Sequence, residues 1–306
     1  MHWILNVSED FSLSGIINIS QWLLLPPYAV GPSAEYLLRV EQLTSGHTVL
    51  LKLWQNPAGL VLQANERLNG LETEELSRKA RRMLRLDDNL ARFLRKAHKT
   101  PALHAAVKHG GIFLRGATLF EDFIKALVLA SSPEDWGRQR ITWLVDRLGA
   151  PLPSNPTHHA FPTPQQLLWG KHLLREMLPL NVSECICDAA EIFYTKANQL
   201  EGLTRSDLPL MVVDQVVRHL LGLEDYAHSL FMLALGRYDY IPTDSHTCQR
   251  LERAWEHPAP ITPEAVIEAF SPWKPWGGLA YWLWDWQVEA VPVPWQGELV
   301  NGNFAN

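Results

Sequence analysis

The sequence predicts an α+β protein, mainly α, in which an N-terminal antiparallel β-sheet is followed by helices. Two observations carry this expectation. Residues 1–70 contain short β-branched and aromatic runs separated by Pro-Pro, Gly-Pro, Ser-Gly and Asn-Pro pairs, which is typical of strands joined by turns. From Thr73 the apolar residues recur every three to four positions, which is the spacing of amphipathic helices.

Each expected element follows from the local pattern and its punctuation. The β-branched and aromatic runs predict strands over 16–19, 36–40, 48–54 and 60–63. Apolar periodicity bounded by Pro, Gly and Asn predicts helices over 72–86, 88–99, 101–108, 117–130, 134–149, 164–176, 183–200, 208–221, 226–235, 244–255, 263–269 and 277–286. Residues 151–163 form a Pro-rich connector, and the tail after Trp286 is too irregular to assign.

A chain of 306 residues is long enough for two or three subdomains. We expect a sheet domain over residues 1–72. A first helical subdomain is expected over 73–149, completed by 255–290, and a second over 150–254.

Composition excludes several classes of protein. No apolar run reaches the roughly 20 residues needed to cross a bilayer, and the first residues resemble no secretory signal, so we expect a cytoplasmic protein without membrane contact. Three cysteines cannot form a disulfide framework or a four-cysteine metal cluster. No His pair has metal-site spacing and no phosphate-loop or dinucleotide motif is present, so we expect neither metal nor cofactor.

The charge is unevenly distributed. The formal net charge of -6 means that any nucleic-acid contact is local. One stretch concentrates positive charge, with Arg78, Lys79, Arg81, Arg82, Arg85, Arg92, Arg95, Lys96 and Lys99. Such a run can follow a phosphate backbone, or it can be the solvated face of two amphipathic helices.

The most informative stretch is 210–251, which reads as a helix, a hairpin containing Gly222, a second apolar helix, and a loop ending in Pro242-Thr243-Asp244-Ser245-His246. It resembles the helix-hairpin-helix DNA glycosylase superfamily, in which a P-x-D-x-H segment carries the catalytic aspartate. Residues 81–127 and 270–286 resemble further parts of the 3-methyladenine and 8-oxoguanine glycosylase branches. The resemblance spans residues 1–286 in order and implies the same fold, double-stranded DNA as partner, and a monomer without an obligate protein partner.

The resemblance places Asp244 at the catalytic position, where a carboxylate stabilises an oxocarbenium-like sugar and orients water. An Asp before a helix is also a common N-cap, and both roles can coexist. Lyase-competent relatives carry a Lys where this chain has Asp225, which implies a monofunctional enzyme that leaves an abasic site. The pocket is expected to contain Asp225, Tyr226, Asp285, Trp282 and Trp284.

The expected DNA contacts depart from the family pattern at two positions. A hairpin can direct backbone N–H groups at phosphates, and we expect this of Gly222, Leu223 and Glu224, although Glu224 replaces the usual second glycine. Ser131 stands where relatives fill the gap left by the flipped base. His246 completes the expected contacts.

The substrate follows from the acidic pocket. Carboxylates accept hydrogen bonds, so Asp225 and Asp285 favour a donor-rich base, such as glucosylated hydroxymethylcytosine in phage DNA; Asp285 pointing to solvent is the alternative. Repair of alkylated or oxidised purines is the other purpose that an active enzyme could serve. A catalytically inactive DNA-binding module is the alternative of another class.

Overall fold

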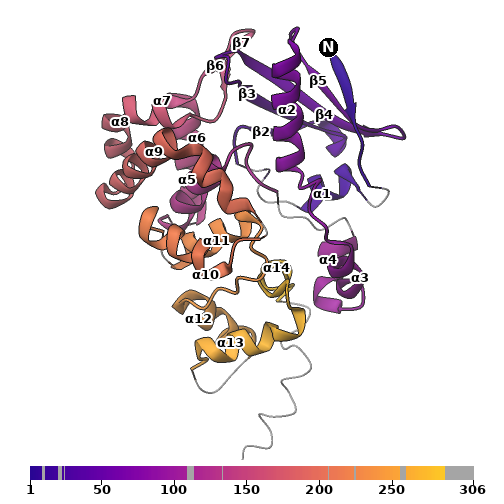
Figure 1. Cartoon of the computed structure of the whole chain (residues 1–306), viewed down its shortest axis with the longest axis vertical. Coiled ribbons are helices and arrows are strands. Elements are labelled where there is room, and N and C mark those ends of the chain that lie inside the picture. Colours follow the sequence, from indigo (N-terminus) through magenta and orange to yellow (C-terminus); the bar gives the residue numbers. More distant parts are fainter. Residues whose placement is uncertain are drawn as a thin grey trace, which may run out of the picture.

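The computed structural model describes residues 1–8, 11–19, 23, 25–108, 114–132, 134–205, 207–223, 225–255 and 260–286, with the backbone alone for residues 18, 19, 105, 108, 134, 135, 198, 220, 225 and 246. Figure 1 shows the N-terminal sheet at one end of the molecule, with the helices beside and below it. Within these residues no helix combines the length and the apolar character needed to span a membrane.

A five-stranded antiparallel sheet forms the N-terminal part, in the order β1-β5-β4-β3-β2. Its strands are β1 (His2–Leu5), β2 (Tyr28–Val30), β3 (Tyr36–Gln42), β4 (Thr48–Asn56) and β5 (Gly59–Ala64). The pairing of β3 with β4 is continuous from Tyr36 opposite Trp54 to Gln42 opposite Thr48. The expected strands 36–40, 48–54 and 60–63 are therefore confirmed.

The run 16–19, which we expected as a strand, belongs instead to helix α1 (Leu13–Ile19). Leu13, Ile16 and Ile17 are buried at helical spacing. The Ser12 hydroxyl accepts a hydrogen bond from the Gly15 amide at 3.1 Å, as a helix cap does. Burial on one face has overridden the strand propensity of the isoleucines.

The rest of the described chain is helical apart from one small hairpin, which confirms the predicted α+β, mainly α class. The helices are α2 (Gly70–Met83), α3 (Ala91–Ala97), α4 (Pro101–Lys108), α5 (Leu119–Ala130), α6 (Glu134–Leu148), α7 (Pro164–Trp169), α8 (Lys171–Met177), α9 (Leu180–Glu201), α10 (Leu210–Gln215), α11 (Asp225–Leu235), α12 (Ser245–Ala254), α13 (Pro263–Phe270) and α14 (Gly277–Leu283). The expected helix 164–176 is divided at Gly170, and α10 continues into a π turn over Val216–Leu220.

Two hydrophobic cores organise these elements. The larger joins the inner face of the sheet to α1, α2, α5, α6 and α7 to α11, with Phe123 and Phe231 in edge-to-face contact at 5.7 Å. The second joins α3 and α4 to α12, α13 and α14, where Phe93 meets Trp273 at 5.8 Å. Segments distant in the sequence are thus packed together, and the domain boundaries at 72, 149 and 254 stay predictions.

The expected connector 151–163 contains a short hairpin of β6 (Pro151–Leu152) and β7 (Asn155–His159). Leu152 and Ala160 pack on Val40 and Leu50 of the large sheet. The hairpin therefore covers part of the outer face of the sheet.

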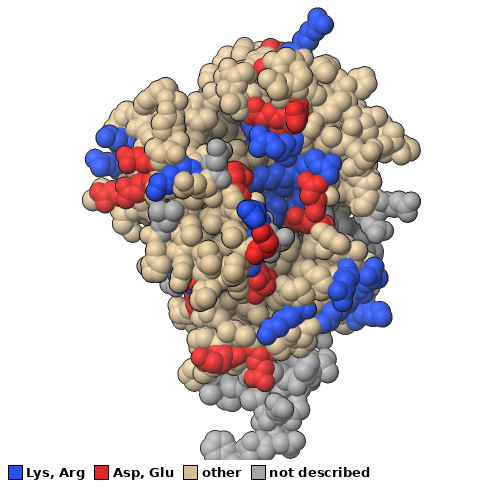
Figure 2. Space-filling view, in the orientation of Figure 1, with Lys and Arg blue, Asp and Glu red and all other residues tan. Residues whose placement is uncertain are grey.

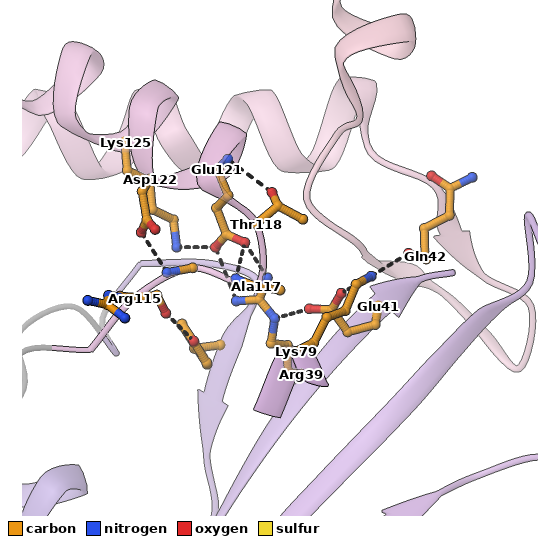
Figure 3. Close-up of polar contacts among 12 residues, drawn as sticks. Arg39, Glu41, Gln42, Lys79, Arg115, Ala117, Thr118, Glu121, Asp122 and Lys125 are labelled. Atoms are coloured by element: carbon orange, nitrogen blue, oxygen red, sulfur yellow. Dashed lines mark hydrogen bonds and ion pairs between the residues drawn. The ribbon is translucent and has the colours of Figure 1, made fainter. Parts of the chain in front are cut away.

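A buried network of ion pairs joins the sheet to α5 (Figure 3). Arg39 of β3 pairs with both Glu41 and Glu121, and the Lys125 ammonium lies 2.7 Å from Glu121. Burial alone would raise the pKa of Glu121, but the charges of Arg39 and Lys125 lower it to about 2. Lys79 of α2 joins the network through Glu41 at 3.0 Å. Removing one partner would leave a buried charge uncompensated, which costs about 3–5 kcal/mol.

Candidate active site

Asp244 lies at the end of the loop after α11 and caps α12. Its carboxylate accepts a hydrogen bond from the Thr247 amide at 2.9 Å and one from the Thr247 hydroxyl at 3.2 Å. That hydroxyl is in turn 3.2 Å from the hydroxyl of Tyr281 in α14. The N-cap interpretation is confirmed. Both carboxylate oxygens are held in place, while the residue keeps partial access to solvent.

The loop that leads to Asp244 begins with a glycine-terminated helix end. Gly236 has a φ of 86°, and the amides of Gly236 and Arg237 donate to the carbonyls of Leu233 and Met232, both at 3.0 Å. This is the Schellman arrangement, which favours glycine because its backbone is left-handed. The Arg237 guanidinium then donates to the Leu208 carbonyl at 2.7 Å. The start of the loop is thereby tied to the segment before α10.

Helix α14 is packed directly on the backbone of this loop. The Gly278 amide donates to the Tyr238 carbonyl at 2.8 Å, and a Cβ at Gly278 would lie only 1.9 Å from the Tyr240 carbonyl oxygen. A Cβ at Gly277 would lie 2.8 Å from the Ile241 side chain. The two glycines allow this close approach. This close packing brings the hydroxyl of Tyr281 in α14 within 3.2 Å of the Thr247 hydroxyl in α12.

A buried polar cluster connects α10, α11 and the loop. His228 is fully buried, with its Nε2 3.1 Å from an Asp214 carboxylate oxygen and its ring 4.8 Å from that of Tyr240. Arg218 donates to the Tyr240 hydroxyl at 3.1 Å and pairs with Asp214 at 3.3 Å. Burial lowers the pKa of His228 to about 4, and the Arg218 charge acts in the same direction. Sequence reasoning missed this cluster, for which a His within the apolar helix 226–235 was the available signal.

The hairpin between α10 and α11 has the backbone that its glycine predicts. Gly222 has a φ of 65°, and Leu223 is fully buried with its amide donating to the Val217 carbonyl at 3.3 Å. The Cys185 thiol lies beneath, 3.8 Å from where a Gly222 Cβ would be. Burial raises the pKa of this thiol to about 11, so it is neutral. Glu224 lies outside the described residues.

The predicted pocket residues occupy different surroundings. Tyr226 and Trp282 are both half-buried, and their ring centroids are 5.6 Å apart. Trp284 is 5% exposed and packs edge-on against Trp273 and Phe270 in the second core, which leaves little of its ring for a ligand.

Two aspartates complete the predicted pocket. Asp285 is half-buried, and its amide donates to the Ala102 carbonyl of α4 at 2.8 Å. Asp225 is the first residue of α11, and its side chain lies outside the described part.

Two further predicted DNA contacts lie in helix α12 and at the end of α5. Ser131 ends α5, and its hydroxyl donates to the Val128 carbonyl at 3.2 Å. Arg140 of α6 donates to the neighbouring Ser132 hydroxyl at 2.6 Å, so this turn is held by α6. His246 lies in the first turn of α12, and its side chain is outside the described part. Among the side chains that are described, no three His, Cys, Asp or Glu gather to hold a metal ion.

Comparison with solved structures identifies the fold. A 3-methyladenine DNA glycosylase from Archaeoglobus fulgidus superposes with a TM-score of 0.70 at 18% identity, covering 92% of this chain and 96% of that chain. An 8-oxoguanine glycosylase/lyase from Clostridium acetobutylicum, in its apo form, gives 0.67 at 15% identity, covering 94% and 96%. The chain has the fold of these DNA glycosylases. The same Clostridium enzyme in complex with double-stranded DNA containing cytosine opposite 8-oxoguanine gives 0.66 at 15% identity, covering 94% and 97%. No protein-family model and no curated protein matches the sequence.

Proposed function

We propose that this protein is a DNA N-glycosylase that flips a modified base out of the duplex and hydrolyses its glycosidic bond. The observation that carries the proposal is the position of Asp244, whose carboxylate is fixed at the N-terminus of α12 in a fold shared with DNA glycosylases. Extruding a nucleotide costs a few kcal/mol of stacking and pairing, which contacts to the backbone must offset. We propose that the hairpin at Gly222 contacts a phosphate through its backbone, with the Leu223 amide excepted because it donates to the Val217 carbonyl at 3.3 Å.

Asp244 carries the chemistry in this proposal. Departure of the base leaves an electron-poor sugar, and a carboxylate beside it stabilises the positive charge and orients the attacking water. The Thr247 amide and hydroxyl each use one carboxylate lone pair, so each oxygen keeps one for water or sugar. The hydroxyls of Tyr281 and Thr247 continue this hydrogen-bonded chain into the protein interior.

Water, rather than an amine, is the nucleophile that we propose. Asp225 stands at the start of α11, where lyase-competent relatives carry the Lys that forms a Schiff base, and a carboxylate cannot form one. The product is therefore an intact abasic site. We place the enzyme in the cytoplasm, acting as a monomer on double-stranded DNA without a cofactor.

For the substrate we propose a bulky polar base such as glucosylated hydroxymethylcytosine in phage DNA, which would make the enzyme part of antiviral defence. Asp225 and Asp285 are acceptors only, and they favour a base rich in amino or hydroxyl donors. Tyr226 and Trp282 offer half-buried rings for stacking. Repair of alkylated or oxidised purines is the alternative, and it is favoured by what the two structural neighbours are named for.

A catalytically inactive DNA-binding module is the competing function of another class. The test incubates the protein with duplexes that carry a panel of modified bases, followed by alkali to reveal abasic sites. Strand scission on one member of the panel supports the enzyme, whereas binding to all duplexes without scission supports the module.

Asp244→Asn gives the matched control for this assay. Asn also caps helices, so the free energy of unfolding should change by less than about 1 kcal/mol. An amide cannot stabilise an oxocarbenium ion, so the single-turnover rate of base release should fall by about 10²-fold or more. A variant that keeps more than about a tenth of the wild-type rate would refute the catalytic assignment.

A further inference from the structure

The run of Lys and Arg over residues 78–99 is divided by the structure into two groups. Two cations of α2 turn inward: Lys79 pairs with Glu41 at 3.0 Å, and Arg82 pairs with Asp122 at 2.7 Å. Arg81 pairs with the exposed Asp87, and Arg78 is exposed. The cations of α3 do not join the buried ion-pair network between the sheet, α2 and α5. Between Asp88 and Glu121 the sequence has six Lys and Arg residues and no Asp or Glu, in a chain whose net charge is -6.

Helix α3 presents its cations to solvent because its other face is fixed in the second core. Phe93 is fully buried, with its ring near those of Trp273 and Trp276. Lys96 donates to the Pro272 carbonyl and lies 4.5 Å from the Trp273 ring, which ties α3 to the turn before α14. The remaining cations of this segment are exposed: Arg92 and Arg95 on α3, and Lys99 in the turn that follows it. Figure 2 shows Lys and Arg gathered where Figure 1 places α3, whereas both signs are mixed over α8 and α9.

This arrangement is unfavourable for a helix of seven residues. Arg92 repels Arg95 at i+3 and Lys96 at i+4, and like charges at these spacings each destabilise a helix by about 0.2–0.5 kcal/mol. Arg92 also lies in the first turn, where the helix dipole disfavours a cation. Within the described residues, no carboxylate forms an ion pair with Arg92, Arg95 or Lys99. The dipole favours Arg95 and Lys96 in the last turn, but their repulsion of Arg92 remains, and a surplus of exposed positive charge in an acidic chain is suited to a polyanionic partner.

We propose that Arg92, Arg95 and Lys99 form a second contact surface for the phosphate backbone of duplex DNA, apart from the hairpin at Gly222. This inference rests on the proposed function. Seven residues of helix span about 10 Å, which is about three axial phosphate spacings of one strand. The surface has charge complementary to a polyanion and is anchored beside α14, which contributes Tyr281 to the candidate site. Its contacts are to phosphate, so they position the duplex without reading its bases.

The test compares two triple variants of the full chain on an unmodified duplex. The first is Arg92→Gln with Arg95→Gln and Lys99→Gln. The control removes the same charge from exposed positions of α6 and α8, through Arg147→Gln, Lys171→Gln and Arg175→Gln. The dissociation constant is measured between 50 and 300 mM salt, a range of about sixfold that resolves a change of one unit in the log–log slope.

The first variant should bind at least tenfold more weakly. The slope of log K against log salt should be shallower by about 2–3, because each phosphate that the protein no longer neutralises lowers it by about 0.9. The control should change the dissociation constant by less than about threefold. Equal weakening of binding in both variants, or an unchanged slope in the first, would overturn the assignment of α3.

Base release at saturating DNA separates this inference from the proposed function. The wild type and the first variant should release base at the same single-turnover rate, because phosphate contacts position the duplex without taking part in the chemistry. If the wild type shows a steeper salt dependence of duplex binding than the first variant but releases no base from the panel, the glycosylase function is refuted and the α3 contact surface is retained. A wild type that does not bind duplex DNA would overturn both.

Discussion

Replacement of Gly278 by Ala tests whether the loop before Asp244 is positioned by α14. The new methyl carbon would lie 1.9 Å from the Tyr240 carbonyl oxygen and 2.8 Å from its carbon, whereas ordinary contact begins at 3.4 Å. Because both obstructing atoms are backbone, no rotamer change relieves the contact. The helix and the loop must therefore separate by about 1.5 Å, the difference between 1.9 Å and the ordinary contact distance of 3.4 Å.

Two effects should follow from this separation. Overpacking costs about 1–3 kcal/mol, and loss of the hydrogen bond from the Gly278 amide to the Tyr238 carbonyl adds about 1 kcal/mol. The free energy of unfolding, measured in urea, should therefore fall by about 2–4 kcal/mol. A reacting group displaced by about 1 Å typically loses about 10²-fold in rate, so single-turnover base release by folded protein should fall by that factor.

Gly149 provides the matched control for this prediction. A Cβ there would also lie 1.9 Å from a backbone oxygen, that of Ala160, but at the end of α6 and in contact with none of the residues around Asp244. Gly149→Ala should lower stability similarly while base release by the folded fraction stays within about twofold of the wild type. If both variants lose activity equally, or if Gly278→Ala loses none, α14 does not position the loop that carries Asp244.

Two further predictions concern the same region. Borohydride should trap no covalent adduct with substrate DNA, because Asp225 cannot form a Schiff base; a trapped species on a denaturing gel would contradict the hydrolytic mechanism. Protonation of His228, whose pKa is lowered to about 4 from an ordinary 6.5, is disfavoured in the folded state, so its contribution to stability is present above pH 6.5 and is lost as pH falls towards 4. Across this pH range the free energy of unfolding of the wild type should fall by up to about 3 kcal/mol, whereas that of His228→Gln should not show this loss. An equal pH dependence of the two proteins would refute the prediction.

The sequence predicts helices best where one face is buried along the whole element. The expected helix 101–108 coincides with α4, and 226–235 differs from α11 by one residue, because periodic apolar positions record which face meets the core. The prediction of a strand over 16–19 was wrong because strand propensity and helical spacing conflict there, and the burial of Leu13 and Ile16 favours the helix. The β6–β7 hairpin was missed because its partner, Val40, is distant in the sequence.

The candidate site was predictable only where one short segment defines a role. Pro242-Thr243-Asp244 predicts a cap, and the structure confirms it. The cluster of Asp214, His228 and Tyr240 comes from three separate segments, and no spacing rule connects residues that only the tertiary fold brings together. The same limit applies to the basic run, since the sequence does not show which cations find buried carboxylates.

Capping and the catalysis that we propose make the same demand on Asp244, which is a carboxylate fixed in position. The N-terminus of a helix is a favourable place for a negative charge, and the Thr247 amide at 2.9 Å prevents the side chain from rotating away. The glycines of α14 and the hydroxyl of Tyr240 fix the loop that carries it. A residue that only capped a helix would not need a loop held from both sides in this way, since an exposed cap contributes about 1 kcal/mol wherever its helix begins. The cap is therefore best understood as the device that positions the charge.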